Sequence, residues 1–146
     1  MVVAHDRPDL GVLLHRLTTA VAQRELPLLR AHGLEMWDYV VLGALEHGSA
    51  PTQTQLAVSV GRDKTRLIQT LDRLEDLGLL HREPDPADRR NRVVTVTAAG
   101  SSILAACRKA IRAMESDLLA NLTHSDRAAF VRDLSTLVES VSGHEG

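Results

Sequence analysis

The sequence is poor in cysteine, in aromatic residues and in long apolar runs. One cysteine among 146 residues cannot build a disulfide framework, and it agrees with a reducing compartment. No apolar run approaches the ~18 residues of a membrane-spanning helix, and the first residues lack a signal-peptide pattern. We therefore expect a cytoplasmic protein with no membrane segment. The 44% hydrophobic and 25% charged residues are typical of one ordinary globular domain.

The chain also lacks the positive net charge of many nucleic-acid-binding proteins. It carries −2 at pH 7 and has an isoelectric point near 6.4, which argues weakly against DNA binding. The charge is nevertheless segregated. Residues 62–73 hold four basic residues against two acidic ones and 89–92 adds three arginines, whereas 114–146 has six acidic residues against two basic ones. A basic surface in the middle of the chain is therefore possible.

Residues 51–78 predict two short helices joined by a tight turn. Thr52 and Gln55 fit a capping box, Gly61 is suited to end the first helix, and Asp63 can cap the second. Apolar residues recur at helical spacing along the second helix: Leu67, Ile68, Leu71, Leu74 and Leu77. The segment is thus predicted to be a helix-turn-helix with this stripe in the core.

Polar side chains of this segment are of types that bind base edges and phosphates. The predicted DNA-contacting residues are Thr52, Gln53, Lys64, Thr65, Arg66, Gln69, Thr70 and Arg73. Arg66 and Gln69 could discriminate guanine and adenine edges in the major groove. A solvated helix face is the alternative, and capping alone explains Thr52. Arg73 could instead form a structural salt bridge with Asp72, Glu75 or Asp76.

Residues 79–82 and 92–96 predict two strands, with 83–88 as a loop because its two prolines exclude helix. This hairpin would be a wing with Arg89, Arg90 and Arg92 near its tip. A narrow DNA minor groove concentrates negative potential and attracts such guanidinium groups. Asp88, two residues from Arg90, could orient it. The alternative is a mobile polar loop.

Helices are predicted on both sides of the helix-turn-helix and wing. A leucine-rich helix comes first, Pro27 is expected to begin a separate short helix that Gly33 closes, and a buttressing helix is expected at about 35–45, ending at His47-Gly48. After the wing, Thr97 can cap a long helix and Thr123 a last one. One small domain cannot cover the apolar faces of these terminal helices, which favours a two-fold dimer.

The centre of the chain resembles the winged-helix core of the MarR family of bacterial transcription regulators. The resemblance spans about half of the chain and rests on the segments Gln55–Glu75, Gly78–Leu80, Arg82–Arg90 and Val96–Gly100. It implies a mainly α fold with a small β-hairpin wing, flanked by N- and C-terminal dimerisation helices.

The expected division is 1–33 for N-terminal dimerisation helices, 34–97 for the winged helix-turn-helix that binds DNA, and 98–146 for C-terminal dimerisation helices, all in one compact domain per subunit. The expected function is transcription regulation. A homodimeric repressor would bind double-stranded DNA at a pseudo-palindromic operator, with its two winged helices one helical turn of DNA apart.

The resemblance also implies a small-ligand pocket between the winged helix and the dimerisation helices, where aromatic compounds loosen DNA binding. The expected lining is His15, Met36, Trp37 and Tyr39, and ordinary core packing is an equally good interpretation. Relatives that sense oxidation carry a reactive cysteine near the start of the chain. Cys107 instead falls on the apolar face of a helix, so we expect an inert buried thiol.

No catalytic, metal-binding or cofactor-binding pattern occurs. The seven histidines are scattered singly, and there is no phosphate-binding glycine loop or nucleophile motif. We therefore expect no catalytic residue, no metal, no cofactor and no enzymatic activity. Two alternatives stay open: a winged helix that binds a protein partner through its Lys64–Arg73 face, and a small enzyme with a deep pocket of perturbed titratable groups.

Overall fold

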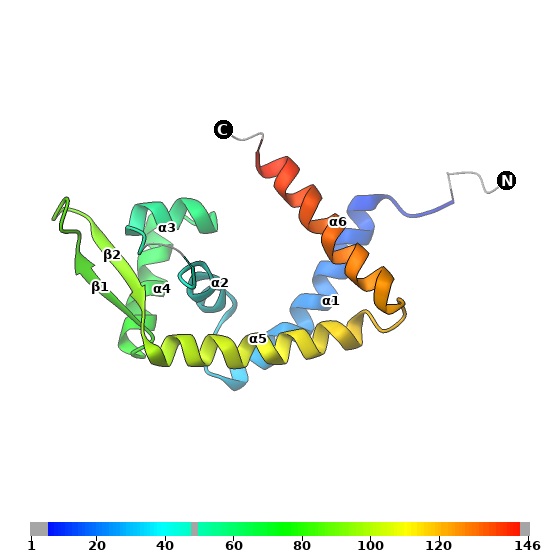
Figure 1. The fold of residues 1–146 in the computed structure, drawn as a ribbon, viewed down its shortest axis with the longest axis horizontal. Coiled ribbons are helices and arrows are strands. Elements are labelled where there is room, and N and C mark those ends of the chain that lie inside the picture. The colour runs from blue at the N-terminus through cyan, green and yellow to red at the C-terminus, as the bar shows by residue number, and fades with distance from the viewer. Residues whose placement is uncertain (1–5, 48–49, 144–146) are drawn as a thin grey trace. The chain divides into compact units, whose positions relative to one another are not determined.

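The fold, in a computed structural model that describes residues 6–47 and 50–143, is mainly α-helical with one β-hairpin (Figure 1). The elements are, in order, α1 Leu10–Ala31, α2 Met36–Ala44, α3 Gln53–Val60, α4 Lys64–Asp76, β1 Leu80–Pro84, β2 Arg92–Val96, α5 Ala98–Leu118 and α6 His124–Ser142. Two compact units divide within α5, one ending at Ile111 and one beginning at Arg112. The predicted fold class is confirmed.

The predicted helix-turn-helix is formed by α3 and α4. The Thr52 hydroxyl accepts from the Gln55 amide at 3.1 Å, and the Gln55 side chain accepts from the Thr52 amide at 2.9 Å, which confirms the capping box. Gly61 then ends α3 with a φ of 67°, a left-handed conformation that suits glycine. Asp63 caps α4 by accepting from the Arg66 amide at 3.0 Å.

The apolar stripe of α4 packs into the core except at its end. Leu67, Leu71 and Leu74 are fully buried, but Leu77 is 52% exposed. The prediction of Leu77 as a core residue is wrong. Leu77 caps the end of α4, and the chain turns away from the helix directly after it at Gly78, whose φ is 74°.

The wing consists of antiparallel β1 and β2, which lie beside α4 and α3 respectively (Figure 1). Their register runs from Leu80 opposite Val96 to Pro84 opposite Arg92, so β1 extends two residues further than predicted and the loop is 85–91. Proline is tolerated at this strand end. The Val94 amide also donates to the carbonyl of Pro51 at 2.9 Å, which ties β2 to the residue before the α3 cap.

The N-terminal helices differ from the prediction at Pro27. The separate short helix expected there is wrong, because α1 continues through Pro27 to Ala31. The fully buried Leu29 packs in the core just after it, and such burial can offset the few kcal/mol that a proline costs a helix. The buttressing helix α2 is confirmed within a residue at each end, and the Gly48 predicted to follow it lies outside the described residues.

Both predicted caps of the C-terminal helices are present. Thr97 accepts from the Gly100 amide at 3.1 Å at the start of α5, and Thr123 accepts from the Asp126 amide at 3.2 Å at the start of α6. Cys107 on α5 is fully buried, and this burial raises the pKa of its thiol. A thiol with a raised pKa is a poor nucleophile, which agrees with the expected inert role.

Candidate nucleic-acid interface

The first two turns of α4 carry exposed polar side chains. Lys64, Thr65, Arg66 and Gln69 are all exposed, and we call these four residues the α4 face. Lys64 Nζ donates to Thr54 Oγ1 on α3 at 3.0 Å, while Arg66 Nε lies 3.5 Å from Asp63 Oδ1 and keeps a side chain that is 73% exposed. Thr65, Arg66 and Gln69 are three and four residues apart, so the helical period places them on one side of α4. Lys64 begins the helix beside α3.

Thr70 is not part of this surface. It was expected among the DNA-contacting residues, but it is only 8% exposed and its hydroxyl donates to the Arg66 carbonyl at 3.3 Å. A DNA contact through the Thr70 side chain would need an exposed hydroxyl, which this position does not provide. A threonine inside a helix can satisfy its hydroxyl in this way on the preceding turn, so a polar residue type alone did not show which way it faced.

Arg73 joins α4 to the start of α2. Its Nη2 atom lies 3.1 Å from Asp38 Oδ2 and donates to the Gly33 carbonyl at 2.9 Å. The salt bridge considered from the sequence exists, but its partner is not Asp72, Glu75 or Asp76. Asp38 is almost fully buried and also accepts from the Glu35 amide at 2.7 Å, so Arg73 neutralises a buried carboxylate. The Arg73 side chain stays 44% exposed.

A cluster around Arg82 was missed by the sequence interpretation. Arg82 Nη2 lies 2.6 Å from Asp72 Oδ1 and 3.0 Å from Glu75 Oε1, both on α4, and Nη1 donates to the side chain of Gln53 at 3.2 Å. Hydrogen bonding to Arg82 lowers the pKa of Glu75. Gln53, predicted to contact DNA, is thus engaged within the protein. The sequence held one signal for this cluster. Arg82 is two residues after the buried Leu80 and so lies on the same side of β1, and this strand directly follows the acid-rich end of α4.

The wing tip has the predicted arrangement of arginine and aspartate. Asp88 Oδ1 accepts from the Arg90 amide at 3.1 Å and from Arg90 Nε at 3.2 Å, which confirms that Asp88 orients Arg90. The Arg90 side chain is nevertheless 91% exposed. Arg89 is exposed, and the exposed Arg92 donates to the Arg82 carbonyl at 3.4 Å. Two exposed arginines, Arg89 and Arg90, therefore lie in the loop at the outer end of the hairpin, whereas the Arg92 guanidinium turns back to Arg82 in the middle of β1.

Two of the four expected pocket residues, Met36 and Trp37, line the same cavity. A cavity of about 430 Å³ is lined by Leu26, Glu35, Met36, Trp37, Asp38, Arg62, Gln69, Thr70 and Arg73. His15 and Tyr39 are not among these residues. The exposed His15 is on α1. Tyr39 interacts instead with Arg108 on α5, whose pKa is raised chiefly by its hydrogen bond to Glu46 and to a smaller extent by one to Tyr39. The Arg62 guanidinium lies 4.3 Å from the centre of the Trp37 ring at the cavity wall.

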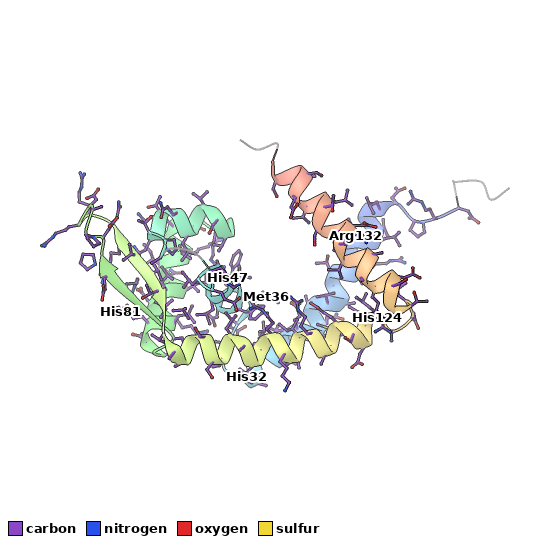
Figure 2. All side chains as sticks on the ribbon, in the orientation of Figure 1. His32, Met36, His47, His81, His124 and Arg132 are labelled. Carbon is purple, nitrogen blue, oxygen red and sulfur yellow. The ribbon has the colours of Figure 1, made fainter. Side chains whose placement is uncertain are left out.

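The histidines lie on different elements. Figure 2 labels His32 after α1, His47 after α2, His81 on β1 and His124 at the start of α6. Within 6–47 and 50–143, no three histidine, cysteine, aspartate or glutamate side chains are grouped as metal ligands would be. His5 and His144 lie outside the described residues. No helix in the described part of the chain is long and apolar enough to cross a membrane.

Comparison with known proteins gives consistent matches to one family. A MarR family model matches residues 32–91. The chain is 33% identical over 114 residues to the transcriptional regulator HosA of Escherichia coli O111:H-, covering 78% of this chain and 81% of that protein.

Two solved structures have the same fold over nearly the whole chain. The crystal structure of MarR has a TM-score of 0.87 at 26% identity and covers all of this chain and 99% of that one. The transcriptional repressor CouR, bound to a 23-mer DNA duplex, has a TM-score of 0.80 at 28% identity and covers 89% of this chain and 92% of that one. With the helix-turn-helix and wing described above, these matches show that the chain belongs to the MarR family of transcription regulators.

Proposed function

We propose that this chain is a homodimeric repressor that binds a pseudo-palindromic operator in double-stranded DNA and is released from it by a small ligand. The proposal is carried by one observation: two exposed basic surfaces, on α4 and on the wing, belong to the same compact unit. The α4 face and the wing arginines both belong to the unit that ends at Ile111. The similar repressor CouR is bound to a DNA duplex, which supports the same partner for this chain.

In this proposal the α4 face enters the major groove and the wing lies along the flanking minor groove. Arg66 and Gln69 carry the forked or amide groups that pair with guanine and adenine edges, and each good bidentate contact is worth about 1–3 kcal/mol of discrimination. Lys64, Thr65 and the wing arginines bind phosphates or the minor groove. Gln53 contributes its backbone amide at the start of α3, since its side chain is engaged with Arg82. Thr52 serves as the cap of α3, because its amide and its hydroxyl both bond to Gln55.

A second copy of the chain is the proposed partner of the terminal helices. None of the described residues of α6 is buried, although it carries the exposed apolar residues Val131, Leu134, Leu137, Val138 and Val141. α1 likewise exposes Leu10, Val12, Leu13 and Leu14. Apolar faces of this extent favour association. We assign 1–33 and 98–146 to dimerisation and 34–97 to DNA binding.

The proposed ligand site is the cavity lined by Met36 and Trp37. Gln69 and Arg73 of α4 belong to the same lining, so an occupant would contact the helix that reads DNA. A ligand releases DNA only to the extent that it binds the DNA-free arrangement more tightly. The role proposed for the chain needs no catalytic step.

Selection of duplexes from a random-sequence pool, followed by fluorescence anisotropy with the selected duplex, tests the proposal. We expect a two-fold-related motif, binding by two subunits in analytical ultracentrifugation, and affinity that falls steeply with salt. A protein-interaction module would enrich no sequence and would leave mixed-sequence duplex unbound. The proposal would be contradicted if no sequence were enriched, if mixed-sequence duplex stayed unbound, or if the protein were a monomer at the concentrations used for binding.

A further inference from the structure

Arg82 connects the wing to both helices of the helix-turn-helix. It lies in the middle of β1, paired with Val94 of β2. From there its guanidinium reaches Asp72 and Glu75 on α4 and the side chain of Gln53 at the start of α3. Its own backbone amide also donates to Glu75 Oε2 at 3.1 Å. A single residue thus ties the strand to two helices.

These contacts make Arg82 unsuited to bind DNA itself. Its side chain is only 10% exposed, and two carboxylates balance its charge. The hydrogen bond to Glu75 is the largest cause that raises the pKa of Arg82, so the guanidinium is charged at every accessible pH. The planar fork of an arginine can bond several acceptors at once in a fixed geometry, which a lysine ammonium cannot do. The arrangement therefore serves the protein scaffold.

The rest of the wing base is held to other elements. Leu80 and Val94 are buried, and Val94 is bonded to Pro51 ahead of α3. Arg82 adds side-chain bonds to α4, the helix with the exposed polar face. The angle between wing and α4 therefore depends on these bonds.

A small change in this angle would be large at the wing tip. Asp88 is six residues beyond Arg82 in the chain, which corresponds to a reach of up to about 20 Å in an extended strand. A tilt of about 10° at the base would then move the tip by up to about 3.5 Å, and shifts of this size break hydrogen bonds. Arg90, whose fork is oriented by Asp88, would no longer meet the same groove as the α4 face.

We propose that Arg82 is a positioning residue for DNA recognition: it sets the angle between the wing and α4, so that Arg90 and the α4 face engage one duplex together. This inference rests on the proposed function. It assigns an effect on DNA binding to a residue that touches no DNA. It also predicts that Arg82 and Arg90 act as one unit although no bond joins their side chains.

A double-mutant cycle measured by fluorescence anisotropy tests this coupling. The duplex is the one that the wild-type protein selects from a random pool, and the variants are Arg82→Gln, Arg90→Ala and the double variant. We expect each single change to weaken binding about tenfold, since the phosphate contacts of the wing are lost together. In the Arg82→Gln background, Arg90→Ala should then cost less than about twofold.

Two further variants separate positioning from charge. Arg132→Gln removes one exposed positive charge from α6 at a position outside the apolar residues proposed to bind the second copy. It should leave affinity unchanged and keep the dimer in analytical ultracentrifugation. Arg82→Lys keeps the charge but not the fork, and should weaken binding nearly as much as Arg82→Gln. A lysine variant with wild-type affinity and salt dependence would overturn the proposal.

Hydrogen exchange of the free proteins supplies a readout that does not involve DNA. Peptides covering 80–96 should exchange faster in Arg82→Gln than in the wild type, while those covering α5 keep their protection. Two results would overturn the inference even if the wild type binds and Arg90→Ala weakens binding as expected. One is unchanged hydrogen exchange in the wing of Arg82→Gln, and the other is a double variant whose loss of affinity equals the product of the two single losses. Absence of any selected duplex for the wild type would instead reject the proposed function, and this inference with it.

Discussion

Gly100 lies in the first turn of α5, where the helix passes directly against the base of the wing. A Cβ atom at this position would lie 2.0 Å from the Leu79 carbonyl oxygen and 2.7 Å from Val96 Cγ2. Real Cβ atoms essentially never come within 3.0 Å of another atom, so the backbone would have to move by at least the 1.0 Å difference between 3.0 and 2.0 Å. Gly100→Ala is therefore expected to destabilise the fold.

The size of the effect follows from what the movement disturbs. The Leu79 carbonyl accepts from the Thr97 amide at 3.1 Å, and the Thr97 hydroxyl donates to the Gly78 carbonyl at 2.7 Å. Overpacking costs about 1–3 kcal/mol and loss of a hydrogen bond about 1 kcal/mol. Alanine regains about 0.5–1 kcal/mol through its better helix propensity. We expect a net loss of about 1–3.5 kcal/mol in the free energy of unfolding.

Urea denaturation followed by circular dichroism at one fixed subunit concentration measures this loss, because association makes apparent stability depend on concentration. Gly11→Ala in α1 is the matched control. Nothing lies within 4 Å of a Cβ built at Gly11, so this change should be neutral or stabilise by about 0.5 kcal/mol. A urea midpoint for Gly100→Ala that equals or exceeds the wild-type midpoint, as expected for Gly11→Ala, would refute the close contact between α5 and the wing base.

Two further predictions concern the acid stability and the thiol. The pKa of Glu75 is lowered by Arg82, so its contribution to stability is present above the ordinary value of 4.5 and is lost as the pH falls through its lower folded value. Glu75→Gln should therefore lose about 1 kcal/mol at pH 7, with the difference from wild type shrinking below pH 4.5 in urea titrations; a difference independent of pH would contradict the assignment. Cys107 should react with a thiol reagent only as fast as the protein unfolds, and peroxide should leave DNA affinity unchanged; rapid labelling of the native protein would show that the thiol is accessible.

Local signals in the sequence predicted most of the fold. The Thr52 and Thr97 caps, the turn at Gly61 and the two strands of the wing each depend on a few neighbouring residues, and all are present. The orientation of Arg90 by Asp88 is local as well. Features of this kind are fixed by backbone geometry and short-range hydrogen bonds, which explains why the sequence alone was sufficient.

Features that depend on distant partners were not predictable in the same way. Arg73 finds Asp38 on another helix, and Arg82 finds acceptors on both α3 and α4, because folding brings together residues far apart in the chain. Thr70 is buried since its neighbours cover it, which a polar residue type does not indicate. Pro27 continues a helix because tertiary packing can override a local preference.

If the wing and the α4 face bind DNA together, the salt dependence of affinity must change when the wing loses a positive charge. Fluorescence anisotropy with the selected duplex, over a series of salt concentrations, is compared for the wild type, Arg90→Ala and Arg132→Ala. Arg90 is 91% exposed at the wing tip, and Arg132 is a similarly exposed arginine on α6. Arg90→Ala should weaken binding and lower the slope of log affinity against log salt by about one, whereas Arg132→Ala should match the wild type. Identical affinities and slopes for Arg90→Ala and the wild type would contradict the account.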